Sequence, residues 1–202
     1  MRKVIKQLGI LAIISILLNP IIAHAQSVKD NIKVPIGGAF SYFDLSDINN
    51  QRWVSTYLRG KPTIILTGHR YQKYEILKWA EAFNYEYQRN NMAYVLWVLN
   101  LSKHPWNTSR ETIFKQWRTF NTSVPLLLDW DGIIGKSLRV NYNIPNIIVL
   151  DSYGRLVMHE MMHYNEDVYR IVSNRIRGYV NEGMALSRPR KKQKKGRRGD
   201  SF

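Results

Sequence analysis

Residues 144–156 read IPNIIVLDSYGRL, and this stretch decides the fold class. Ile147 to Leu150 is an apolar run of the length typical of a strand buried on both faces. The turn sequence Asp151-Ser152-Tyr153-Gly154 follows, and Arg155 to His159 then predicts a second strand. Two strands joined by so short a connection pair antiparallel. The stretch therefore predicts an antiparallel pair preceded by a proline at a strand edge.

Working outward, the rest of the chain alternates strand-like and helix-like segments. Three apolar runs predict buried strands and a shorter stretch predicts a first strand: Pro62 to Thr67, Met92 to Leu99, Pro125 to Leu128, and Ser41 to Leu45. Helices are expected over Tyr71 to Arg89, Ser109 to Phe120, Ile133 to Val140 and Asn165 to Gly183, with a short helical approach at Arg52 to Leu58. Strands joined through helices lie parallel in a sheet. The expected fold is an α/β three-layer sandwich, a central mixed sheet with helices on both faces.

The first 25 residues read as a signal peptide. The basic start MRKVIK precedes an apolar run from Leu8 to Leu18, and Ala23-His24-Ala25 provides small residues at the positions that signal peptidase reads. We expect residues 1–25 to be removed and the protein to be exported, either periplasmic or secreted. The alternative is a membrane anchor, for which the apolar run is short. The rest then divides into an N-terminal extension (26–39), a folded domain (40–183) and a basic tail (184–202).

The basic tail holds much of the formal net charge of +15. Its eight cationic side chains are Arg188, Arg190, Lys191, Lys192, Lys194, Lys195, Arg197 and Arg198. A run so poor in apolar residues has no core to form, and we expect it to be disordered. Outside a cytoplasm it would meet anionic envelope surfaces and bind them in a salt-sensitive way. The alternative is a solvated tail with no single partner; specific nucleic-acid binding conflicts with export and is not expected.

The chain contains no cysteine. This excludes disulfides, thiolate zinc sites, iron–sulfur clusters and every mechanism with a cysteine nucleophile. His159 and His163 have the spacing of a metal-binding pair on a helix, but His159 ends a predicted strand, where such spacing separates the two side chains. We therefore predict neither a metal site nor a cofactor.

Four sequence motifs together resemble a known family. They are FDLSD (43–47), LRGKPTIIL (58–66), PLLLDWDG (125–132) and the stretch at 144–156. In order and spacing they are similar to the redoxin and peroxiredoxin branch of the thioredoxin-like superfamily over about residues 40–180. The resemblance implies the thioredoxin-like fold, with Pro145 as a cis proline that faces the active-site turn. It also implies that this turn, after the first buried strand, presents a catalytic cysteine at a helix N-terminus, where its thiolate is stabilised.

In this chain the corresponding loop, residues 67–75, reads TGHRYQKYE and contains no thiol. Gln72 and Glu75 stand where the resemblance places a pair of cysteines. Thiol–disulfide exchange and peroxide reduction both need a thiolate, so we expect neither activity from this chain alone. We interpret the loop as a degenerate active site that binds a ligand through His69, Arg70, Tyr71, Gln72 and Glu75, together with Pro145.

The loop also contains an acid–base pair that is consistent with a different chemistry. His69 with Glu75 would be a general base and its orienting partner. The alternative is an exposed polar turn, which we favour because neither a nucleophile nor a metal set accompanies the pair. No catalytic residue is predicted.

Two functions from different classes are consistent with these observations. The first is an exported, non-catalytic module that binds a peptide, a protein or an envelope surface, with its basic tail as an electrostatic anchor. The second is an oxidoreductase or antioxidant protein of the redoxin family that acts with a partner supplying the thiol. The sequence does not identify the partner.

Overall fold

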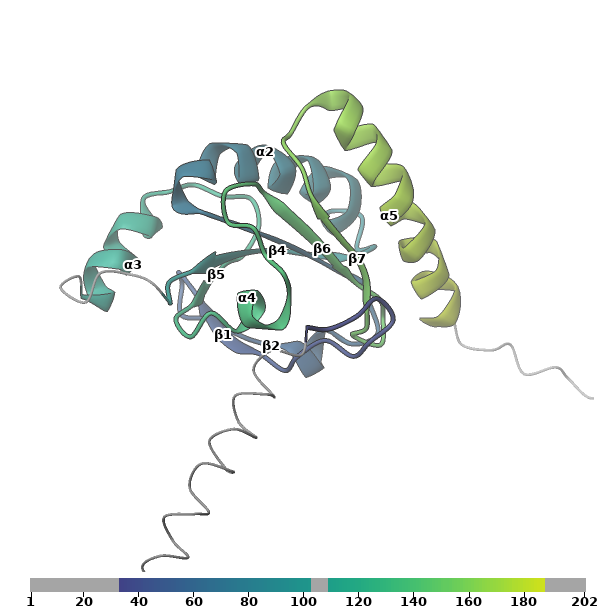
Figure 1. Ribbon diagram of the computed structural model, residues 1–202, viewed down its shortest axis with the longest axis horizontal. Coiled ribbons are helices and arrows are strands. Elements are labelled where there is room, and N and C mark those ends of the chain that lie inside the picture. The colour runs from purple at the N-terminus through teal and green to yellow at the C-terminus, as the bar shows by residue number, and fades with distance from the viewer. Residues whose placement is uncertain (1–32, 103–108, 188–202) are drawn as a thin grey trace, which may run out of the picture.

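The computed structural model describes residues 33–102 and 109–187 (Figure 1). Its strands are β1 (Asp44–Asp47), β2 (Arg52–Val54), β3 (Thr63–Gly68), β4 (Tyr94–Asn100), β5 (Leu126–Asp129), β6 (Asn146–Leu150) and β7 (Leu156–Met161). Its helices are α2 (Lys73–Phe83), α3 (Arg110–Arg118), α4 (Ile133–Ser137) and α5 (Glu166–Ser187), with the 3₁₀ turns η1 (Ser55–Leu58) and η2 (Arg70–Gln72) and the π-helical turn η3 (Asn84–Gln88). The expected signal peptide and the eight cationic residues of the tail lie outside the described residues.

All strands form one mixed sheet in the order β2-β1-β5-β4-β3-β6-β7. β3, β4 and β5 are parallel neighbours, whereas β6 pairs antiparallel with both β3 and β7. The mixed sheet and the antiparallel pair of residues 144–156 are thereby confirmed. Because β3, β4 and β5 run in the same direction, their carboxyl ends meet at one edge of the sheet, and the loops that follow them lie close together.

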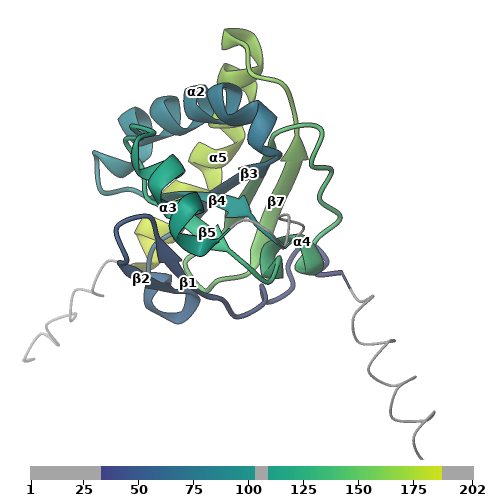
Figure 2. The same cartoon turned by 90° about the vertical axis from the view of Figure 1, so that its left-hand side faces the viewer.

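The core lies on both faces of the sheet, which explains the uninterrupted apolar runs. In β3, Ile64 and Leu66 pack toward α2, α3 and α5, while Ile65 packs toward η1 and α4. β4, β5 and β6 alternate in the same way, because successive side chains of a strand point to opposite faces. Figure 1 shows α2 and α5 along one face, and Figure 2 shows α4 on the opposite side. The predicted three-layer sandwich is confirmed.

One segment departs from the prediction. Residues 52–58 are not a helical approach: Arg52–Val54 form the edge strand β2 and only Ser55–Leu58 turn helically. β2 pairs antiparallel with β1, and its Arg52 guanidinium binds Asp44 of that strand at 2.5 Å. The cross-strand pairing thus overrides the weak local preference of so short a segment. The sheet consequently has seven strands in the described part of the chain.

The last helix is longer than predicted. α5 continues past Gly183 to Ser187. Gly183 does not end the helix, because it is buried where the helix approaches Pro62: an added Cβ would lie 2.8 Å from the Pro62 Cγ atom. Its lack of a side chain permits close packing rather than a helix cap.

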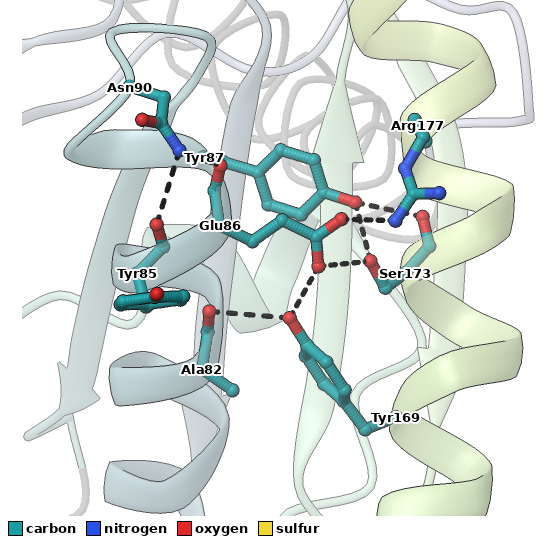
Figure 3. Close-up of polar contacts among 8 residues, drawn as sticks. All are labelled: Ala82, Tyr85, Glu86, Tyr87, Asn90, Tyr169, Ser173 and Arg177. Carbon is teal, nitrogen blue, oxygen red and sulfur yellow. Dashed lines mark hydrogen bonds and ion pairs between the residues drawn. The ribbon is translucent and has the colours of Figure 1, made fainter.

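A polar cluster fastens α5 to the end of the α2–η3 helix (Figure 3). The carboxylate of Glu86 accepts hydrogen bonds from Tyr169 and Ser173, both at 2.5 Å, and pairs with Arg177 at 2.7 Å. The Tyr87 hydroxyl, fully buried, donates to the Ser173 carbonyl at 2.8 Å. Tyr169, Ser173 and Arg177 are four residues apart along α5 and therefore share one face of it. We name these five residues the Glu86 cluster.

Among residues 33–102 and 109–187, no helix combines the length and the apolar character needed to cross a membrane.

Candidate functional site

A groove of about 970 Å³ opens at the carboxyl ends of β3 and β4. One wall is the β3–α2 connection with the first turn of α2, and the opposite wall is α4 with the chain just before and after it. Helix α3 closes one end. The lining side chains are Lys33, His69, Arg70, Tyr71, Lys73, Tyr74, Leu99, Asn100, Leu101, Ser102, Gln116, Trp117, Lys136 and Tyr142, with Gly68, Gly132 and Gly135.

The β3–α2 connection is held by hydrogen bonds within the loop. The Gln72 side chain turns back and accepts from the His69 N–H at 3.2 Å. His69 Nδ1 accepts from the Tyr71 N–H at 3.4 Å, and the His69 N–H also donates to the Tyr142 carbonyl at 3.0 Å. The loop is thereby tied to the opposite wall through residue 142, and His69, Arg70 and Tyr71 are exposed at the rim. These three predicted site residues do line the groove.

Gln72 and Pro145 meet at Gly68, the last residue of β3. A Cβ added to Gly68 would lie 2.7 Å from Gln72 Oε1 and 3.7 Å from Pro145 Cα. The expected proximity of Pro145 to the Gln72 loop is therefore present, behind the groove rather than in its lining. Neither Gln72 nor the buried Pro145 is among the residues that line the groove.

The expected cis configuration of Pro145 is wrong. The peptide bond before Pro145 is trans, like every other peptide bond of the described residues. Trans is the lower-energy form of an X-Pro bond. The fully buried Asn146 side chain holds the turn before β6. It donates hydrogen bonds to the carbonyls of Asn141 at 2.8 Å and Ile144 at 2.7 Å.

Glu75 lies outside the groove. Its carboxylate accepts from the Tyr164 N–H at 2.7 Å and contacts His163 Nδ1 at 2.9 Å. It thereby fixes the β7–α5 connection against α2. His69 contacts Tyr71 instead, so the structure does not bring His69 and Glu75 together as a base and its orienting partner.

Sequence reasoning missed the opposite wall. Asn100 Nδ2 donates to the Tyr142 hydroxyl, and Asn100 Oδ1 accepts from both the N–H and the hydroxyl of Ser102, at 2.9 and 2.8 Å. The Lys33 ammonium donates to the Lys136 carbonyl at 2.8 Å. One signal was readable: Asn100 ends the buried parallel strand β4 and Ser102 follows it, the place where α/β proteins carry ligand-binding groups. The positions of Lys33 and Tyr142 depend on tertiary packing.

The lining is positively charged. Among the described residues, the lining holds Lys33, Arg70, Lys73 and Lys136 and no aspartate or glutamate. Within the described part of the chain, none of these four cations forms an ion pair with a carboxylate. The carboxylate below α4, Asp129, is fully buried and accepts from the Ile133 and Ile134 N–H groups.

Asp129 is therefore a structural cap rather than a site residue. Burial raises its pKa, against the effect of the backbone hydrogen bonds. These bonds hold the start of α4, whose Lys136 faces the groove. Asp129 thus closes the turn of the PLLLDWDG segment between β5 and α4.

The described residues contain no group of three side chains arranged to hold a metal ion. The two histidines with metal-like spacing have separate partners. His159 contacts Asn146 Oδ1 at 3.1 Å, whereas His163 contacts Glu75.

No protein-family model and no curated protein sequence matches the chain. Solved structures do. A structure assigned to the thiol:disulfide interchange protein DsbE from Chlorobium tepidum is 11% identical, with a TM-score of 0.59, over 73% of this chain and 99% of that one. The exposed lipoprotein thioredoxin of Streptococcus pneumoniae is 15% identical, with a TM-score of 0.51, over 66% of this chain and 99% of that one.

A third match is the thioredoxin domain of a thiol-disulfide oxidoreductase from Bacteroides vulgatus, 14% identical with a TM-score of 0.52, over 71% of this chain and 99% of that one. At such identities the likeness shows the fold. The resemblance of the sequence motifs and the geometry of the sheet thus agree: the chain has the thioredoxin-like fold, and it has it without a single cysteine.

Proposed function

We propose that this protein is an exported, non-catalytic module that binds a peptide or an extended segment of a protein in the groove. The observation that carries the proposal is the groove itself. It lies at the carboxyl edge of a parallel sheet, where α/β folds bind their ligands, and it is lined by polar, aromatic and apolar side chains. No thiol accompanies these side chains, so binding rather than redox chemistry is the function they support.

The distribution of the lining over several elements favours an extended ligand. The lining comes from segments before α4, after β3 and β4, and from α3, so a bound chain would contact several elements at once.

Export and surface attachment belong to the same proposal. The signal-like start of the sequence supports export, and one neighbour in fold is named as an exposed lipoprotein. The basic tail would then attach the protein to an anionic envelope surface through long-range, salt-sensitive attraction.

The test is selection of ligands from a random peptide library on the full chain, followed by mapping of the site by NMR. We expect selected peptides to shift the backbone amide signals of Gly68, Ser102, Gly132 and Gly135, which line the groove. Amides at the far end of the sheet, such as that of Ser152, serve as the internal control and should not shift.

Two outcomes would contradict this proposal. Peptides that shift only amides outside the groove would locate binding elsewhere. Insulin reduction or peroxide consumption that appears when a thiol-bearing partner is added, and disappears on mutation of Arg70 or Tyr71, would favour the partner-assisted oxidoreductase instead.

A further inference from the structure

We infer that the groove binds acidic peptides, whose carboxylates it recognises through unpaired cations and the hydroxyl of Tyr142. This inference rests on the proposed function and names the class of its ligand. It depends on three features of the described residues: the charge of the two walls, the hydrogen-bonding state of Tyr142, and the apolar part of the lining.

The cations stand on both walls of the groove. Arg70 and Lys73 lie on the α2 side, and Lys33 and Lys136 on the α4 side. Elsewhere in the described structure, arginines form ion pairs with carboxylates. Arg175, for example, binds Glu160 at 2.6 Å. Four cations that face one groove without such partners repel one another, and an anionic ligand relieves this repulsion.

Neighbouring groups hold these cations in position. The Lys33 ammonium is fixed by the Lys136 carbonyl at 2.8 Å and keeps two further N–H donors. The Arg70 guanidinium lies 5.1 Å from the Tyr71 ring centroid, and the Lys73 ammonium 4.9 Å from that of Tyr74. Cations held over aromatic rings lose less conformational freedom when a ligand binds.

Tyr142 adds a neutral donor at the base of the α4 wall. Its hydroxyl accepts the amide hydrogen of Asn100, and Asn100 is in turn fixed by two bonds from Ser102. With its acceptor side occupied, the hydroxyl has its own proton to donate. Burial raises the pKa of Tyr142, so the proton is retained at neutral pH. The hydroxyl therefore suits a carboxylate or carbonyl oxygen.

The lining also has an apolar part that favours a peptide over other polyanions. Leu99, Leu101 and Trp117 line the groove with the small exposed part of side chains that are 3–7% exposed, and Tyr74, which also lines it, is 65% exposed. A peptide with alternating acidic and apolar side chains matches both the cations and the apolar surface.

The experiment measures fluorescence anisotropy of a labelled peptide of glutamate, leucine and serine. The protein is the full chain with its eight tail cations changed to glutamine, so that the tail does not bind the probe. We expect this peptide to bind at least about ten-fold more tightly than a matched peptide with glutamine for glutamate. Lys136→Gln and Tyr142→Phe should each weaken binding by about five- to ten-fold.

Lys78→Gln is the matched control, because Lys78 is an exposed lysine of α2 that does not line the groove. Its affinity should equal that of the parent. Thermal unfolding of each variant shows whether a loss of affinity is a loss of fold.

The outcomes separate this inference from the proposed function. If the glutamine peptide binds as tightly and shifts the groove amides, the acidic specificity is wrong and the peptide-binding function stands. If neither peptide binds, the acidic specificity is wrong, and the selection from the random peptide library decides separately whether the peptide-binding function stands. A single-stranded oligonucleotide or an acidic polysaccharide that binds more tightly, with the same dependence on Lys136 and Tyr142, would replace the peptide as the ligand.

Discussion

At Gly135 the groove wall depends on a missing side chain. A Cβ at this position would lie 1.9 Å from the Tyr142 hydroxyl oxygen, far inside van der Waals contact. Glycine is otherwise unfavourable in a helix, and Gly135 lies within α4. Glycine at this position lowers helix stability but leaves room for the Tyr142 hydroxyl, which bonds to Asn100.

Gly135→Ala is expected to destabilise the protein by about 1–3 kcal/mol, because the added methyl group overpacks the contact with Tyr142. It should also weaken binding of the acidic peptide, since Tyr142 must move. Gly178 of α5 is the matched control: nothing lies within 4 Å of a Cβ built there. Gly178→Ala should stabilise the helix by about 0.5–1 kcal/mol in chemical denaturation. Equal effects of the two substitutions would contradict this account.

The Glu75 carboxylate stabilises the β7–α5 connection against α2. Glu75→Ala removes the acceptor of the Tyr164 N–H and the contact with His163, and should lower the free energy of unfolding by about 1–2 kcal/mol. Peptide affinity should not change, because Glu75 faces away from the groove. Glu81→Ala, an exposed glutamate of the same helix, should change neither quantity. If Glu75→Ala loses peptide binding and keeps the stability of the parent, Glu75 is a ligand-binding residue after all.

At the scale of elements, the Glu86 cluster decides how α5 is attached. Burial by itself would raise the pKa of Glu86, but hydrogen bonds from Ser173, Tyr169 and Arg177 outweigh it and hold the pKa below its ordinary range. Burial also raises the pKa of Tyr87 to about 12. The cluster thus contains one carboxylate anion stabilised by neutral hydroxyls and one guanidinium.

The lowered pKa makes the stability of the protein depend on pH. A carboxylate whose pKa is lower in the folded than in the unfolded chain stabilises the fold above the unfolded value, about 4.3 for glutamate, and loses this effect as the pH falls through the folded value. Glu86→Gln should lower the free energy of unfolding by about 1–2 kcal/mol at neutral pH and flatten its decline in acid. Urea denaturation at a series of pH values measures both.

Asp167→Asn is the control for this series. Asp167 is also an acidic residue of α5, but its side chain is 82% exposed and its pair with Arg170 lies on the surface. Its replacement should leave the decline of the free energy of unfolding at low pH unchanged. If the free energy of unfolding falls as steeply with decreasing pH in Glu86→Gln as in the parent, the pH dependence belongs to other carboxylates.

The strands of this fold were readable from sequence, and the reason is burial on both faces. Ile64, Ile65 and Leu66 are all at most 1% exposed, so the sequence shows an unbroken apolar run. β2 escaped detection because it is a three-residue edge strand in which only Val54 is buried. Its pairing with β1, not its own pattern, makes it a strand.

Of the candidate site, only the loop of the α2 wall could be predicted. The loop at His69, Arg70 and Tyr71 follows a strand directly and was found by its position in the chain. Lys33 and Tyr142 reach the groove from segments far apart in sequence, through contacts that no local pattern encodes. The Glu86 cluster was missed for the same reason, although the four-residue spacing of its α5 members was visible.

At the scale of the whole molecule, the dominant property is the formal charge of +15, much of it in the basic tail. Deletion of residues 188–202 is expected to reduce binding to vesicles that contain anionic lipid, and so is an increase in salt, because attraction between exposed charges is screened beyond about 8 Å at physiological ionic strength. Cosedimentation measures binding, and vesicles of neutral lipid are the control. Binding that survives both deletion and salt would exclude the tail as the anchor.

The close contact of Gly183 with Pro62 matters if the basic tail attaches the protein to a surface. Pro62 precedes the first residue of β3, whereas Gly68, at the groove, is the last of its six residues. These two ends are about 20 Å apart at roughly 3.3 Å per residue, and α5 ends beside the first of them (Figure 1). If the basic tail anchors the protein, the point of attachment lies at the end of β3 opposite to the groove, so the anchor itself does not cover the groove.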